Sequence, residues 1–125
     1  MKTTIIILTI LLYSFTAQAG DWTRKDTYFE AAALATIALD YSQTKGMVSK
    51  GFMIDGRPYE EHNPIMGSRP SSQTVDLYFA SVAVAHVAVA YLLPQKWRRW
   101  FQAGTIVLEL GVVAGNYSAG LGFGF

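Results

Sequence analysis

The chain contains no cysteine, and this absence removes disulfide bonds, thiolate nucleophiles and cysteine-ligated metals from its possible chemistry. Charge is also scarce: charged residues make up 15% of the 125 residues, and the net charge is +1. A chain with so little excess positive charge has no strong basic field to attract nucleic acid, so we do not expect nucleic acid as a partner. Hydrophobic residues make up 51% of the chain, which favours a membrane protein or a very well-buried core.

The N-terminus has the pattern of a secretory signal peptide. Lys2 supplies a positive charge, residues 5–12 form an apolar run, and a small-residue cleavage pattern ends at Ala19. We therefore assign residues 1–19 to a signal peptide and residues 20–125 to a single helical membrane domain. The alternative is an uncleaved first membrane helix, for which an unbroken apolar run of about eight residues is short.

Apolar periodicity predicts an all-α fold with three helices after the signal peptide. The first covers residues 27–44, and the second covers residues 76–93, where no glycine or proline interrupts the apolar run. The third covers residues 95–117 and opens with tryptophan beside arginine, which is typical of an anchor at the membrane interface. We expect the last two helices to form a hairpin, with Gly111-x-x-x-Gly115 allowing close approach to a neighbouring helix or to a second copy of the chain.

A long connection, residues 46–74, joins the first two helices, and Gly46 is the predicted end of the first one. Connections of this length are usually functional or disordered. Asn63 precedes Pro64, which restricts its backbone to extended geometry and should aim its side chain consistently. This loop is a candidate surface for binding another envelope protein. The contacts would come from Tyr59, Met66 and Arg69.

The basic residues near the third helix suggest a topology. If Lys96, Arg98 and Arg99 are cytoplasmic, the long loop and the C-terminus face the periplasm, and the first helix is re-entrant or packed on the surface. We prefer this version, a bacterial inner-membrane protein with a periplasm-facing loop. In the alternative, all three helices span the membrane and the loop is cytoplasmic. A soluble helical periplasmic domain is a further alternative.

Two short motifs, Asp40-x-x-x-Thr44 and Glu61-x-Asn63-Pro64, resemble those of an uncharacterised family of small bacterial and phage membrane proteins. These proteins carry Asp-x-x-x-Thr at the end of one helix and Glu-x-Asn-Pro before the next. The similarity covers residues 40–67, which hold both motifs. The downstream helices share only the general apolar character of the family. The longer spacer and the signal-like N-terminus depart from the family, so its topology is not carried over. The resemblance implies a shared site at these residues and no particular reaction.

Polar side chains within otherwise apolar helices mark the candidate site. An unsatisfied polar group costs several kcal/mol in hydrocarbon, so such side chains face one another or a wet cavity. Gln102, Glu109 and Asn116 repeat every seven residues and form a narrow polar stripe. The candidate polar site consists of Asp40, Gln43, Thr44, Glu61, His62, Asn63, His86, Glu109 and Asn116.

Several functions are compatible with these side chains. A buried network that fixes helix register is the simplest. A metal-dependent membrane hydrolase is an alternative, although the sequence lacks the paired spacing of known metal motifs, a Gly-x-Ser-x-Gly elbow and a catalytic cysteine. Its metal ligands would be Asp40, Glu61, His62, His86 and Glu109. We expect a small envelope membrane protein with a structural or regulatory role, without a cofactor. Its expected partners are the lipid bilayer and an envelope protein.

Overall fold

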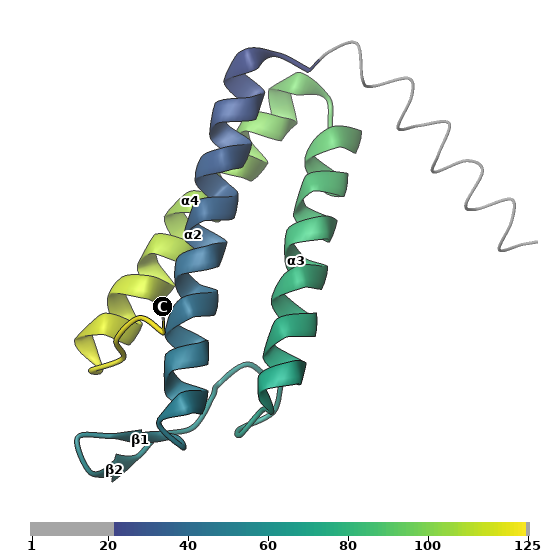
Figure 1. Cartoon of the computed structure of the whole chain (residues 1–125). Coiled ribbons are helices and arrows are strands. Elements are labelled where there is room, and N and C mark those ends of the chain that lie inside the picture. The colour runs from purple at the N-terminus through teal and green to yellow at the C-terminus, as the bar shows by residue number, and fades with distance from the viewer. Residues whose placement is uncertain (1–21, 125) are drawn as a thin grey trace, which may run out of the picture.

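The computed structural model describes residues 22–124, which form three long helices and a minimal two-stranded sheet (Figure 1). The elements in order are α2 (Arg24–Ser49), β1 (Met53–Ile54), β2 (Arg57–Pro58), α3 (Ser72–Leu92) and α4 (Gln95–Ser118). The predicted helical fold is therefore confirmed for this part of the chain. The predicted signal peptide, residues 1–19, lies outside the described residues.

Local capping explains where the helices begin. The Thr23 hydroxyl accepts a hydrogen bond from the backbone N–H of Asp26, and the Asp26 carboxylate accepts one from the backbone N–H of Thr23. Ser71 caps α3 by accepting from the backbone N–H of Thr74. Pro94 separates α3 from α4 because proline has no backbone N–H to donate the next hydrogen bond of α3.

Gly46 does not end the first helix, so the prediction of a helix stop there is wrong. α2 continues to Ser49, and Gly46 instead makes room for the C-terminal tail. A Cβ at Gly46 would lie 3.1 Å from the carbonyl oxygen of Gly122 and 3.3 Å from the nitrogen of Gly124. The backbone N–H of Gly124 also lies 2.9 Å from both the carbonyl and hydroxyl oxygens of Ser42. The tail is therefore held against the last turns of α2.

α2 is the central helix of the bundle, and α3 and α4 both pack along it (Figure 1). α3 and α4 are joined at Pro94 as the predicted hairpin requires, but they contact each other little. The glycines expected to bring them together face open space, since a Cβ at Gly111 or Gly115 would meet nothing within 4 Å. The prediction of close packing within the chain through these glycines is wrong. Their contact with a second copy stays a prediction.

The length of α2 bears on the preferred topology. α2 has 26 residues, compared with 21 in α3 and 24 in α4. At 1.5 Å per residue, each of the three is about 30 Å long or longer, which is the thickness of a bilayer hydrocarbon core. The first helix is therefore longer than the predicted 27–44, and its re-entrant or surface-packed placement stays a prediction.

The bundle is polar inside and apolar outside. The side chains with 0% exposure include Asp26, Gln43, Arg98 and Gln102. Large apolar side chains are instead 70–73% exposed, namely Val84, Trp100, Val107 and Leu108. In the described part of the chain, α3 is the one helix whose length and composition suit a membrane span, and 22% of its apolar window is buried. A core helix of a soluble protein would be mostly buried, so the apolar face of α3 is unusually open to its surroundings.

A small apolar core lies between α2 and α3 near the long loop. It contains Ile37, Met66, Val75 and Phe79, each at most 8% exposed. Met66 comes from the loop itself and fastens it to the two helices. Met66 is therefore not an exposed contact for a partner, which corrects the prediction for that residue.

Candidate functional site

Polar side chains gather at two places, which we call the loop-end cavity and the inner network. The loop-end cavity has a volume of about 430 Å³ and lies where α2, α4 and the long loop meet. The predicted site residues that line it are Asp40, Thr44, Glu61, His62, Asn63, Glu109 and Asn116. The inner network lies in the other half of the bundle and consists of Asp26, Glu30, His86, Arg98, Gln102 and Thr105. The structure thus brings most of the predicted site together and places His86 elsewhere.

Asn116 connects the two helices that form the wall of the loop-end cavity. Its side-chain nitrogen donates to Asp40 Oδ1 at 3.2 Å and to Gln43 Oε1 at 3.1 Å. Gln43, which is fully buried, donates in turn to the backbone carbonyl of Val113 at 3.0 Å. Gln43 therefore does not line the cavity, but it holds Asn116 in position beside Asp40.

The loop segment that carries the Glu-x-Asn-Pro motif is internally braced. Glu61 Oε1 accepts from the backbone N–H of Asn63 at 2.9 Å, and Asn63 Oδ1 accepts from the backbone N–H of Ile65 at 2.9 Å. The second bond forms an Asx-turn, so the expectation that the Asn63 side chain has a fixed direction is confirmed. Burial and the nearby Glu61 carboxylate raise the pKa of the Tyr59 phenol, which keeps it a neutral hydrogen-bond donor at the cavity wall.

Glu109 is the least satisfied side chain at the cavity. Its Oε2 atom is buried and has no hydrogen-bond partner. Asp40 and Glu61 add two further carboxylates to the lining, which contains neither lysine nor arginine. A buried acceptor without a donor is unfavourable, and carboxylates that share a confined space repel one another. Both features favour a positively charged, hydrogen-bond-donating group in this cavity.

His86 belongs to the inner network, where both of its ring nitrogens are engaged. Nδ1 lies 2.8 Å from Glu30 Oε1, and Nε2 lies 2.9 Å from the Thr105 hydroxyl. Gln102 donates to the other oxygen of Glu30 at 2.8 Å. His86 also stacks on Phe101, with ring centroids 4.4 Å apart. These partners correct the prediction that His86 joins the other site residues, and they indicate a closed structural cluster.

Arg98 forms the end of the inner network that is farthest from the loop. Its side chain has no exposed surface, and it donates to Asp26 Oδ2 at 3.1 Å and to the carbonyl oxygens of Ala90 at 2.7 Å and Leu93 at 3.0 Å. It therefore joins α2, α3 and α4 and is not a snorkelling anchor. The flanking Trp97 and Trp100 are 58% and 73% exposed, and their role as interfacial anchors stays a prediction.

The sequence interpretation missed Asp26, Glu30 and Arg98. Asp26 and Glu30 are four residues apart and therefore share one helix face. The Thr23-x-x-Asp26 capping pattern could have extended the predicted helix far enough to include both. Arg98, which points inward, lies four residues before Gln102 and therefore on the predicted polar stripe, whereas Arg99 does not, so helix spacing could have identified it.

The described residues contain no group of three histidine, aspartate or glutamate side chains placed to hold a metal ion. The ligand set considered from the sequence is divided, because His86 is engaged by Glu30 and Thr105 while Asp40, Glu61, His62 and Glu109 surround the loop-end cavity.

Comparison of the chain with family models, with curated proteins and with solved structures finds no match. The resemblance of the two short motifs to a family of small membrane proteins therefore stays a prediction.

Proposed function

We propose that this chain is a small helical membrane protein of the bacterial envelope with an interaction role. Its loop-end cavity would receive a basic side chain of a partner protein. The observation that carries this proposal is a cavity lined by three carboxylates within a bundle whose outer face is apolar.

The distribution of polarity supports a membrane location. Burying charged and amide side chains while exposing valine and leucine is unfavourable in water, where apolar area is driven inward. In hydrocarbon the same arrangement is favourable, because polar groups must satisfy one another inside the bundle. The buried pairs of Arg98 with Asp26 and of His86 with Glu30 meet this requirement.

The chemistry of the cavity supports the binding of a basic side chain. A guanidinium or ammonium group would supply donors to Glu109 Oε2, which has none, and would offset the charge of Asp40 and Glu61. Arginine suits such a site better than lysine, because its planar donors can engage two carboxylates at once.

The rim of the cavity supports a protein as the source of this group. Ile65 lies between the lining residues Pro64 and Met66 and is 78% exposed. An exposed large apolar side chain beside a polar pocket is typical of an interaction surface. Ile65 therefore replaces the buried Met66 as the apolar contact of this loop.

A binding measurement tests the cavity directly. Acetyl-arginine amide should bind the detergent-solubilised protein more tightly than acetyl-citrulline amide, which has nearly the same shape and no charge. Glu61→Gln and Glu109→Gln should each weaken binding of the arginine compound by about 1–3 kcal/mol. Calorimetric titration measures both effects.

Glu60→Gln is the matched control, because Glu60 is exposed, adjacent to Glu61 and absent from the cavity lining. It should leave binding unchanged. Equal binding of the arginine and citrulline compounds, or equal effects of Glu60→Gln and Glu61→Gln, would remove the support for a basic guest.

A further inference from the structure

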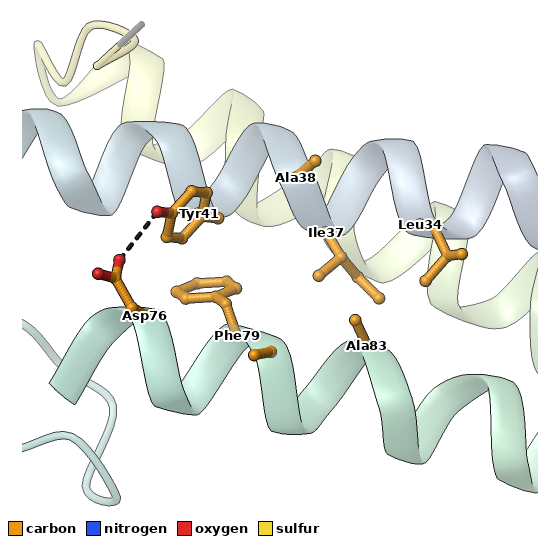
Figure 2. Close-up of a pocket in the computed structure, with 8 residues that line it drawn as sticks. Leu34, Ile37, Ala38, Tyr41, Asp76, Phe79 and Ala83 are labelled. Atoms are coloured by element: carbon orange, nitrogen blue, oxygen red, sulfur yellow. Dashed lines mark hydrogen bonds between the residues drawn. The ribbon is translucent and has the colours of Figure 1, made fainter. Parts of the chain in front are cut away.

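A groove separate from the loop-end cavity runs between α2 and α3 (Figure 2). It has a volume of about 420 Å³, and Figure 2 shows side chains of both helices pointing into it. The apolar lining comes from Leu34, Ile37, Ala38, Phe79, Ala80 and Ala83. A second hollow, which reaches Val84 and Val87, shares Leu34 and Ala83 with the groove and therefore continues it along the bundle.

We propose that this groove holds one acyl chain of a membrane phospholipid, with the phosphate of that lipid at Lys45. The inference rests on the proposed membrane location. In a bilayer, any apolar hollow on the outer face of a protein borders lipid chains, and a groove that the protein leaves open is filled by one of them.

The length of the groove fits one leaflet. From Asp76 at one end to Val87 at the other, α3 advances eleven residues, or about 16 Å at 1.5 Å per residue. Half of the hydrocarbon core of a bilayer is about 15 Å thick. A single acyl chain lying along the groove would therefore extend from the headgroup level to about the bilayer midplane.

The polar groups are confined to the end where a headgroup would lie. Lys45 Nζ donates to Asp76 Oδ1 at 2.8 Å and to the hydroxyl of Ser72, and the Tyr41 hydroxyl donates to the same Asp76 oxygen at 2.8 Å. An ammonium group has three donors, so Lys45 keeps one for a phosphate oxygen. Lys45 also balances the charge of Asp76, and the Lys45 side chain is 24% exposed.

Native mass spectrometry of the full chain in detergent tests this site. With added dioleoylphosphatidylglycerol, the wild-type protein should retain one lipid. Ala83→Phe fills the groove where the two hollows meet, and it should reduce the retained fraction at least about tenfold. Ala85→Phe makes the same change on the same helix at an exposed position that lines neither hollow, and it should retain lipid as the wild type does.

Two further variants test the headgroup contact and the groove separately. Lys45→Met should remove the preference for dioleoylphosphatidylglycerol over dioleoylglycerol, which lacks the phosphate. Ala80→Leu fills the groove with a smaller side chain and should also reduce retention, which gives a second measurement if Ala83→Phe does not fold.

Other outcomes would overturn the assignment. They include no lipid retained by the wild type, equal retention by Ala83→Phe and Ala85→Phe, or a dimer that is lost with Ala83→Phe. Failure of the proposed membrane location is distinguishable, because the protein would then stay monodisperse without detergent.

Discussion

Arg98 and Arg99 are adjacent in the sequence but have different surroundings. Arg98 is fully buried and pairs with the buried Asp26, whereas Arg99 is 38% exposed and lies 3.5 Å from the same carboxylate. We expect Arg98→Met to destabilise the protein by about 3–5 kcal/mol, because it leaves the carboxylate without its main counter-charge. Arg99→Met should cost less than about 1 kcal/mol, since exposed ion pairs contribute little. Equal shifts in the midpoint of unfolding in detergent would contradict the assigned roles.

Glu30 and Glu109 form a second contrasting pair. Glu30 bonds both His86 and Gln102, whereas Glu109 keeps one buried oxygen without a partner. Glu30→Ala should therefore destabilise the protein by about 1–3 kcal/mol, because two buried donors lose their acceptor. Glu109→Gln should leave stability within about 0.5 kcal/mol, because no hydrogen bond of the folded protein depends on that oxygen. A larger loss for Glu109→Gln would show that Glu109 is a structural residue. Thermal unfolding in one detergent gives both values.

Among the individual site residues, the positions of some could be predicted from the sequence and those of others could not. The seven-residue repeat placed Glu109 and Asn116 on one face, and Asn116 does meet Asp40 across the interface. Residue type alone suggested that His86 would join them. The partners of His86 depend on which turn of α2 lies beside it. This is set by the axial register of α3 against α2, two helices that are distant in sequence. Such registers are set by tertiary packing, which no local pattern contains.

The three helices were predictable because each has its own apolar periodicity, and their ends differ from the predictions by five residues or fewer. The small hairpin was not predicted, although Asp55-Gly56 is a sequence typical of a two-residue turn and the φ values of 49° and 75° suit one. Which helix occupies the centre could not be predicted. α2 is less apolar than α3, and it becomes central because its polar side chains need partners on both neighbours.

Gly46 and Gly104 are both helical glycines, and they should respond differently to the same change. A Cβ at Gly104 meets nothing within 4 Å, so Gly104→Ala should stabilise the protein by about 0.5–1 kcal/mol through helix propensity. At Gly46 the added Cβ presses on the backbone of the C-terminal tail, which offsets that gain. Gly46→Ala should therefore give no net stabilisation and should make the tail more accessible to carboxypeptidase. Equal stabilisation by both changes would mean that the tail is not held at this position.

On the scale of the whole molecule, the proposed membrane location and the similar lengths of the helices lead us to predict that all three span, although α3 alone among the described helices also has the composition of a span. If α2, α3 and α4 all span, the Pro94 turn and the start of α2 lie on one side and the long loop on the other. Basic residues occur at both ends in nearly equal numbers, so their distribution favours neither orientation. They are Arg24, Lys25, Lys96, Arg98 and Arg99 at one end and Lys45, Lys50, Arg57 and Arg69 at the other. The predicted signal peptide would place the start of α2 in the periplasm, and we use this expectation to choose the orientation.

This topology predicts a cytoplasmic loop, the alternative to the periplasm-facing loop preferred from the sequence. Because the chain has no cysteine, single cysteines report cleanly on each side. Gln95→Cys, next to the Pro94 turn, should react with a membrane-impermeant maleimide in intact spheroplasts. Ser118→Cys, at the far end of α4, should react only after the membrane is permeabilised. The reverse pattern would restore the periplasm-facing loop, and labelling of both positions in intact spheroplasts would show that α4 does not cross the bilayer.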